Sequence, residues 1–259
     1  VVVSTNDGLY CYNIQTGKQL FKEGGSSSGA VFSKDGSVIY AGDYSNLQIY
    51  DANTGKKIKN ISAVVNGSAS NCKFYELGNN RLLVLYYFGW SIVNTATEAF
   101  EVKSFFNDAY REKLSAYDYD RASNTIVGLR DEQFVAFDVT TAKLIATKKA
   151  LYYPLGFCTL SNNQVAAFSH DYKTKSYKIE LMQLPSLTVS KTISQPDSEV
   201  PETIFYGTRP IPIPVTQNVF YNNNNELFAV NTTTGRYEKK FTNKIDDFKT
   251  FFYFKNLTQ

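Results

Sequence analysis

The sequence predicts an all-β protein made of repeated four-stranded units, and two observations indicate this class. Aromatic residues make up 15 % of the 259 residues, with nineteen Tyr and nineteen Phe, which favours strands over helices. A short apolar segment, one polar residue and a turn also recur, with the polar residue at Asn13, Asp51, Asn94, Asp138, Gln183 and Asn231. Their spacings of 38, 43, 44, 45 and 48 residues match the period of roughly 40–50 residues of a β-propeller.

Each repeat contains four short strands, designated a to d in chain order, and four such strands form one propeller blade. In the second repeat, "AVFS", "SVIYAG" and the marked strand "LQIYD" precede the last strand. The predicted domain spans the whole chain, 1–259, with repeat units at 1–24 plus 248–256, 28–61, 71–105, 115–148, 155–193 and 209–241.

The two ends of the sequence predict six blades. The chain begins with three strands, "VVVST", "LYCYN" and "KQLFK", and ends with one further strand at Phe248–Asn256. If this last strand pairs beside Val1–Thr5, it completes the first blade and closes the ring, which removes exposed strand edges. Seven blades are the alternative if residues are missing at the termini.

The sixth unit contains the alternating prolines Pro210, Pro212 and Pro214. Proline is normally excluded from central strands because it lacks an N–H donor. Alternate N–H groups of a strand point to the same side, so all the missing donors would lie along one free edge. Residues 210–215 are therefore predicted to form strand a, with an extended polyproline-like loop as the alternative.

The recurring Thr-Gly-Lys turn, as in "LQIYDANTGKKI" (47–58), raises the question of phosphate binding. A phosphate loop needs a glycine-rich turn between a strand and a helix, whereas here a second strand follows. Asp51 is expected to accept hydrogen bonds from the turn, and Gly55 to supply a positive φ. The cations near these turns would share one face, either as a solvated rim or as a patch for an anionic partner: Lys18, Lys56, Lys57, Lys143 and Arg236.

The opposite face of the predicted propeller carries the b–c turns and the loops between units, which vary in length. The longest of these loops, 195–208, contains Asp197, Glu199 and Glu202. Exposed Tyr and Phe are typical interface anchors, with packing beneath loops as the alternative. The candidate partner-binding residues on this face are Tyr87, Phe88, Tyr110, Tyr152, Tyr153, His170 and Tyr172.

The sequence offers little for catalysis. His170 is the only His, and its neighbours Ser169 and Asp171 would point to the opposite face of a strand. A zinc site would need clustered His and Cys. Calcium could use the b–c turn carboxylates of Asp43, Asp131 and Asp171, although Asp is also common in turns. We therefore expect no catalytic residues, no metal and no cofactor.

Composition also limits the partners. A net charge of +3 argues against a dedicated nucleic-acid binder. The longest apolar run, Leu82–Val93, is shorter than the roughly 20 residues that span a bilayer. Cys11, Cys72 and Cys158 are odd in number and lie in apolar runs, which predicts buried free thiols and a cytoplasmic location. The expected partners are proteins, with no nucleic acid and no membrane insertion.

The second unit, "AVFSKDGSVIYAGDYSNLQIYDANTGKKI", resembles a WD40 repeat, with Tyr50-Asp51 where that family has Trp-Asp. The first and sixth units are similar to the repeats of quinoprotein-type propellers. The WD40 likeness implies a non-catalytic scaffold that presents loops to partner proteins. The quinoprotein likeness would imply a periplasmic or secreted dehydrogenase, or a non-enzymatic relative. Quinoprotein enzymes stack their cofactor on Trp and use calcium, and this chain has one Trp, Trp90.

A protein-interaction scaffold is thus the leading hypothesis. One alternative is a propeller enzyme, or a ligand- or metal-binding propeller of the quinoprotein, lactonase or glycosidase kind, with its site at the channel mouth. Another is a propeller module of a larger protein.

Overall fold

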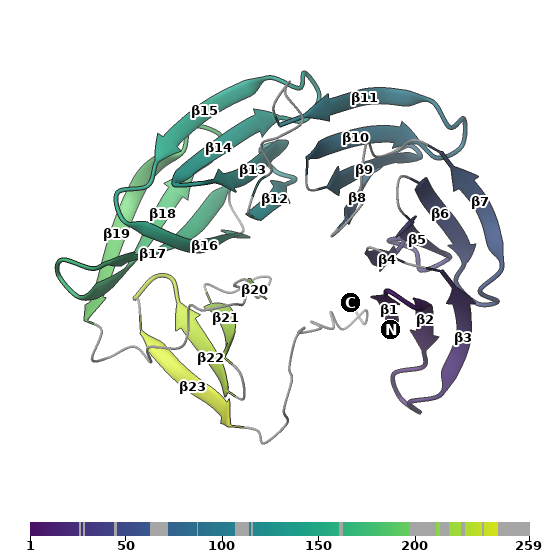
Figure 1. Cartoon of the computed structure of the whole chain (residues 1–259), viewed down its shortest axis with the longest axis horizontal. Helices are drawn as coiled ribbons and strands as arrows, with labels where there is room; N and C mark the ends of the chain where they lie inside the picture. The colour runs from purple at the N-terminus through teal and green to yellow at the C-terminus, as the bar shows by residue number, and fades with distance from the viewer. Residues whose placement is uncertain are drawn as a thin grey trace. The chain divides into compact units, whose positions relative to one another are not determined.

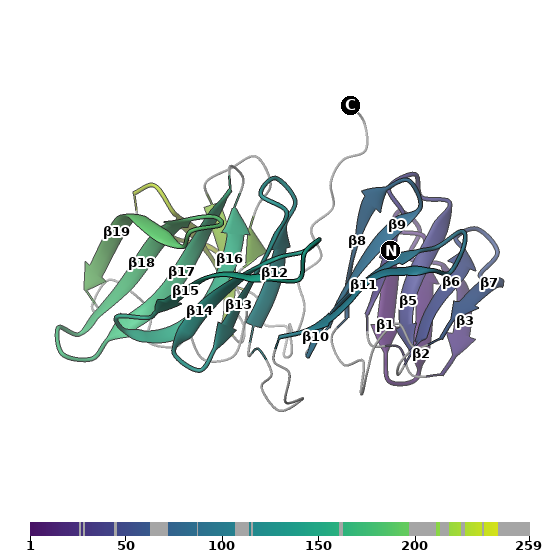
Figure 2. The same ribbon diagram turned by 90° about the horizontal axis from the view of Figure 1, so that it is seen from above.

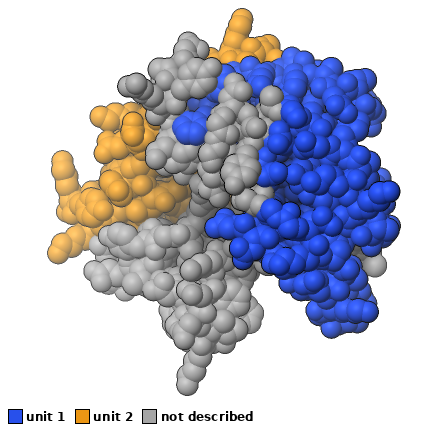
Figure 3. Space-filling view, turned by 45° about the vertical axis from the view of Figure 1, so that its right-hand side comes forward, with its two compact units in different colours: residues 1–114 blue, residues 115–259 orange. Residues whose placement is uncertain are grey.

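The computed structural model describes residues 1–25, 27, 29–43, 46–62, 72–86, 88–106, 114, 116–160, 163–196, 211–212, 218–223, 226–234 and 236–242. Within these residues every regular element is a β-strand (Figure 1), and Figure 2 shows the same strands from above. The chain divides into two compact units, residues 1–114 and 115–259 (Figure 3). The predicted all-β class is therefore confirmed.

The first unit contains three antiparallel sheets whose strands follow chain order. The first sheet consists of β1 (Val2–Thr5), β2 (Gly8–Tyr12) and β3 (Gln19–Gly24). The second consists of β4 (Ala30–Phe32), β5 (Val38–Asp43), β6 (Asn46–Asp51) and β7 (Lys57–Ile61). The third consists of β8 (Lys73–Gly78), β9 (Arg81–Tyr86), β10 (Gly89–Asn94) and β11 (Phe100–Phe105). Strand β4 lies beside both β1 and β8, so the sheets meet along their first strands.

The second unit contains three four-stranded antiparallel sheets. The first consists of β12 (Ala116–Asp120), β13 (Thr125–Arg130), β14 (Gln133–Asp138) and β15 (Leu144–Lys149). The second consists of β16 (Tyr153–Leu160), β17 (Gln164–Asp171), β18 (Ser176–Gln183) and β19 (Thr188–Pro196). The third consists of β20 (Ile211–Pro212), β21 (Asn218–Asn223), β22 (Glu226–Asn231) and β23 (Tyr237–Thr242). Strand β16 lies beside both β12 and β20, which repeats the arrangement of the first unit.

The antiparallel four-stranded sheets predicted from the sequence are present. The number of blades and the residue limits of the repeats stay predictions. The predicted closing strand, 248–256, lies outside the described residues, as do Pro210 and Pro214. Strand β20 forms an edge of its sheet and contains Pro212. Proline is tolerated in an edge strand where its N atom faces away from the sheet, and β20 is an edge strand.

The core lies between the faces of neighbouring sheets. Strand β9 has three consecutive residues, Leu83, Val84 and Leu85, each no more than 1 % exposed, because both of its faces are covered. One cluster joins side chains of the second and third sheets, among them Leu47, Ile49, Phe74 and Leu82. A second cluster joins the β12–β15 and β16–β19 sheets, among them Val127, Phe134, Phe157 and Met182. The outermost strands instead alternate between exposed and covered positions, as in β15.

The polar residue that ends strand c organises the turn to strand d. The Asp51 carboxylate accepts hydrogen bonds from the backbone N–H groups of Asn53 (3.0 Å) and Thr54 (2.8 Å), and from the Thr54 hydroxyl (2.8 Å). These donors lower the pKa of Asp51. Side-chain oxygens at four other marked positions accept from the following turn in the same way: Asn13, Asn94, Asp138 and Asn231. The turn interpretation of Thr-Gly-Lys is confirmed.

The fourth residue after each marked polar residue adopts a left-handed backbone conformation in five of these turns, whether or not it is Gly. Gly17 and Gly55 have φ of 68° and 73°. At the same position of the next three turns, Glu98, Ala142 and Leu187 have φ between 57° and 65°. A left-handed conformation costs a residue with a Cβ about 1–2 kcal/mol. The fixed hydrogen-bond pattern of the turn therefore overrides the preference of the residue.

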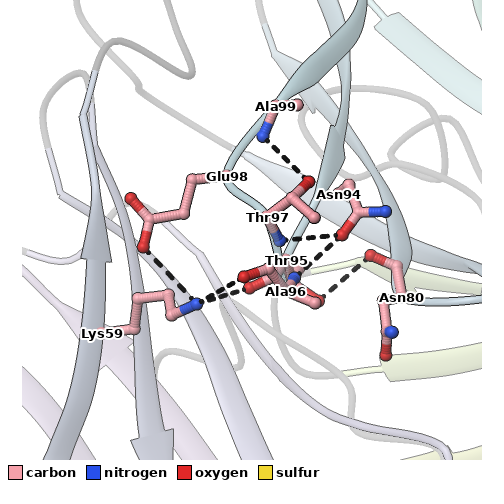
Figure 4. Close-up of polar contacts among 8 residues, drawn as sticks. All are labelled: Lys59, Asn80, Asn94, Thr95, Ala96, Thr97, Glu98 and Ala99. Atoms are coloured by element: carbon pink, nitrogen blue, oxygen red, sulfur yellow. Dashed lines mark hydrogen bonds and ion pairs between the residues drawn. The ribbon is translucent and has the colours of Figure 1, made fainter.

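Strand d of one sheet also contacts the turn of the next sheet in the unit, through the fourth residue after the left-handed position. In β7 this residue is Lys59, whose Nζ donates to the carbonyl oxygens of Thr95 (2.8 Å) and Ala96 (3.3 Å). The ammonium also lies 3.4 Å from the Glu98 carboxylate (Figure 4). The equivalent Lys191 of β19 donates to the Thr233 carbonyl at 2.6 Å.

The equivalent residue of β3 is apolar. The Phe21 ring lies against Gly55, where a Cβ would overlap it. Two lysines and one phenylalanine thus make the same junction between neighbouring sheets by different chemistry. The lysines donate hydrogen bonds to carbonyl oxygens of the neighbouring turn.

We predict that Gly55→Ala destabilises the fold more than Gly17→Ala. Both substitutions place a Cβ at a positive φ, which costs about 1–2 kcal/mol. Only the Cβ at residue 55 meets a neighbour, the Phe21 ring, whereas none of the described atoms lies within 4 Å at residue 17. Chemical denaturation should give a loss about 1–3 kcal/mol larger for Gly55→Ala. Equal losses of unfolding free energy in the two variants would show that the Phe21 ring does not restrict the residue at position 55.

We predict that Lys59→Met lowers the free energy of unfolding by about 1–2 kcal/mol, since it leaves the Thr95 and Ala96 carbonyls without their charged donor. Glu98→Gln removes only the ion pair between two partly exposed side chains and should lower it by less than about 1 kcal/mol. Lys56→Met, in an exposed turn, is the control. Denaturation curves measure all three, and a Lys59→Met protein as stable as the control would contradict the capping role.

Candidate functional site

Three strands of the β16–β19 sheet bring aromatic side chains together at one end. In the register of the sheet, Tyr153 pairs with His170, and His170 pairs with Tyr177. Residues directly opposite one another place their side chains on the same face, so the three rings form a row across β16, β17 and β18. The rings of His170 and Tyr177 have centroids 4.7 Å apart. Tyr172 follows β17 and extends the group, 4.4 Å from His170 and 5.9 Å from Tyr153.

This group, the aromatic end (Tyr153, His170, Tyr172 and Tyr177), changes from buried to exposed along its length. Tyr177 is 6 % exposed and His170 is half-buried, whereas Tyr153 and Tyr172 are 53 % and 59 % exposed. Leu151, just before β16, is 72 % exposed. The Tyr153 ring therefore contacts the Tyr172 ring, which packs on the half-buried His170, and His170 in turn packs on the buried Tyr177. Ordered, exposed Tyr rings are the side chains that commonly anchor protein interfaces.

Tyr152 lies apart from this row, although it is the neighbour of Tyr153. Adjacent residues of a strand point to opposite faces. The Nζ of Lys178 lies 5.6 Å from the centroid of the Tyr152 ring and donates to the Ser194 hydroxyl at 2.7 Å. The sequence grouped Tyr152 with Tyr153, but the structure joins Tyr153, His170 and Tyr172 and places Tyr152 against Lys178.

The turn between β17 and β18 lies beside the aromatic end and is held by Asp171. Its Oδ1 accepts from the N–H groups of Lys173 (3.0 Å) and Thr174 (3.4 Å), and its Oδ2 accepts from the Thr174 hydroxyl at 2.6 Å. The Thr174 hydroxyl is the main cause that lowers the pKa of Asp171. Both carboxylate oxygens are therefore committed to the turn, while Lys173 and Lys175 are exposed.

Of the other aromatic candidates, Phe88 is described and lies in the first unit, between β9 and β10. It packs against the core cluster of the second and third sheets, and its carbonyl accepts from the Phe106 N–H at 2.9 Å. This corresponds to the alternative reading of a ring packed beneath a loop. Tyr87 and Tyr110 lie outside the described residues.

The candidate basic residues near the c–d turns are all exposed. Lys18, Lys56 and Lys57 belong to the first unit, and Lys143 and Arg236 belong to the second. The Lys57 Nζ lies 5.6 Å from the centroid of the Tyr50 ring. Their binding of an anionic partner stays a prediction.

The described residues include no group of three or more His, Cys, Asp or Glu that could hold a metal ion. Two of the carboxylates considered for calcium have local roles, since Asp43 accepts from the Gln48 amide at 2.7 Å and Asp171 holds its turn. Cys11, Cys72 and Cys158 are buried and unbridged, and burial raises the pKa of the Cys11 thiol. In the part of the chain that is described, no helix has the length and hydropathy to cross a membrane.

Sequence reasoning missed Leu151, Tyr177 and Lys178 as members of the site or its surroundings. The spacing of His170 and Tyr177 around a short polar turn is the signal that could have paired them, because residues near a hairpin turn face one another. That signal requires the register of the hairpin, which the sequence alone leaves open.

Comparison with known proteins gives a fold. No protein-family model and no curated protein sequence matches the chain. Among solved structures, a chain in the crystal structure of the mitotic checkpoint complex matches with a TM-score of 0.66 over 95 % of this chain and 74 % of that chain. The fold is that of a β-propeller built of antiparallel sheets. Identity to that chain is 11 %, so the likeness shows the fold and leaves the activity of this propeller open.

We predict that Thr174→Val raises the pKa of Asp171 toward its ordinary value. The Thr174 hydroxyl donates to the ionised carboxylate and favours that form, so its removal makes protonation easier. The hold of Asp171 on the turn, which is lost as pH falls through the lowered pKa, should then be lost at higher pH. An NMR titration of the Asp carboxyl carbons measures the shift, with Asp51 as the unaffected control. An unchanged Asp171 titration would contradict this account.

Proposed function

We propose that this chain is a non-catalytic propeller scaffold that binds partner proteins through the aromatic end of the β16–β19 sheet. The observation that carries the proposal is the pair of exposed rings, Tyr153 and Tyr172, supported by the buried Tyr177 and the half-buried His170. Rings that are already ordered lose little conformational entropy when a partner covers them, and this favours binding.

Binding at this surface would require more than the two rings. Full burial of one such side chain contributes roughly 1.5–3 kcal/mol. Micromolar affinity corresponds to about 8 kcal/mol, so two rings supply only part of it. Leu151 offers a third apolar contact, and the exposed lysines of the neighbouring turn offer polar ones.

The proposal assigns binding without bond chemistry. His170 lies between the rings of Tyr172 and Tyr177, and its strand neighbours Ser169 and Asp171 belong to the other face. The structurally similar chain belongs to a protein complex, and we propose that this propeller also works within an assembly. We further propose a cytoplasmic location, which the buried unbridged cysteines support.

We predict that Tyr153→Ala combined with Tyr172→Ala abolishes partner capture by the purified chain. Both rings are more than half exposed, so the fold should keep its stability while the interface loses its anchors. Affinity purification with quantitative mass spectrometry compares the variant with the native chain. The control is Phe100→Ala, which removes an exposed ring of β11 elsewhere. Equal capture by the native chain and the double variant would refute the assignment of this site.

A further inference from the structure

We infer that the partner segment bound at the aromatic end is an acidic peptide, recognised jointly by the exposed Tyr rings and by lysines of the β17–β18 turn. This inference rests on the proposed function, because it names the chemistry of the partner at the same surface. It goes further in assigning the recognition of charge to Lys173 and Lys175.

Among the described residues, the β17–β18 turn beside the aromatic end carries more positive than negative charge. Lys173 and Lys175 are exposed on this turn, which also carries Tyr172. The carboxylate within this turn is Asp171, and both of its oxygens already accept hydrogen bonds from Lys173 and Thr174. A partner would therefore meet ammonium groups next to apolar rings. Carboxylates of the partner would complement them and speed association.

The type of residue at the left-handed position distinguishes this turn from the β13–β14 turn of the neighbouring sheet. Lys175 has a φ of 49°, and Asp131 in the β13–β14 turn has a φ of 50°. Asp and Asn tolerate the left-handed region through local hydrogen bonds, whereas a lysine there carries a cost of about 1–2 kcal/mol. Gly or Asn would form the turn more favourably. Lys175 nevertheless occupies this position, in the same exposed turn as Tyr172.

The arrangement of the rings favours a peptide over a single-stranded nucleic acid. The His170 ring meets the Tyr172 ring edge-on, at an interplanar angle of 82°, and the Tyr153 and Tyr172 rings are tilted by 59°. Recognition of single strands uses rings on which successive bases stack in parallel. Rings set at steep angles to one another do not offer such a series of parallel stacking surfaces.

The test uses a random peptide library displayed on phage and selected on the full chain. Three baits are compared: the native chain, the lysine variant Lys173→Gln with Lys175→Gly, and the ring variant Tyr153→Ala with Tyr172→Ala. The lysine variant also relieves the positive φ at residue 175, so it should be at least as stable as the native chain. Any loss of binding by this variant therefore reflects lost charge and not a damaged fold.

We expect the native chain to enrich peptides in which Asp and Glu outnumber Lys and Arg and accompany an apolar residue. A synthetic peptide from this selection should bind the lysine variant about tenfold more weakly, with a smaller dependence on salt. It should fail to bind the ring variant. Fluorescence anisotropy measures all three affinities.

The outcomes separate this inference from the proposed function. Selection of neutral or basic peptides, or equal affinity for the native chain and the lysine variant, would overturn the acidic partner while leaving the aromatic site in place. Failure to enrich any peptide that depends on the Tyr rings would overturn both. Tighter binding of a single-stranded DNA oligonucleotide than of the selected peptide, with loss in the lysine variant, would replace the acidic peptide with a nucleic acid.

Discussion

The second strands of four described sheets, β5, β9, β13 and β17, are buried on both faces, and a single sheet can cover neither face by itself. Strand β9, with Leu83, Val84 and Leu85 all buried, is stable only because neighbouring sheets lie on both sides. The clusters that join the second sheet to the third, and the β12–β15 sheet to the β16–β19 sheet, meet this requirement. The turns, the hydrogen bonds of Lys59 and Lys191 to neighbouring turns, and the exposed loops all depend on the burial of apolar side chains between sheets.

This constraint leaves the b–c turns free to vary, because they lie beyond the buried strands. The β17–β18 turn uses that freedom to carry Tyr172, Lys173 and Lys175. The row of Tyr153, His170 and Tyr177 continues from the buried strands to the surface, so the rigidity of the core extends to the exposed rings. If the aromatic end binds a partner as proposed, its rings need no rearrangement before the partner arrives.

The sequence predicted the architecture well because its signals are local and repeated. The marked residues ended strand c, and Asp51 and Asn231 accept the expected turn hydrogen bonds. Other features depend on contacts that no local pattern contains. Lys59 caps carbonyl groups 36 and 37 residues away. Tyr152 contacts Lys178 whereas Tyr153 contacts Tyr172, and these contacts depend on the pairing of β16, β17 and β18.

The junctions between neighbouring sheets differ in chemistry, and this makes the repeats non-interchangeable. Phe21 fits a turn with Gly at the left-handed position, whereas Lys59 fits a turn that offers two carbonyl oxygens and the Glu98 carboxylate. If the second and third repeats exchanged places, Phe21 would meet a side chain at the position of Gly55. The contacts at the junctions therefore determine the order of the repeats. Shuffled or duplicated repeats would assemble poorly although each kept its own sheet.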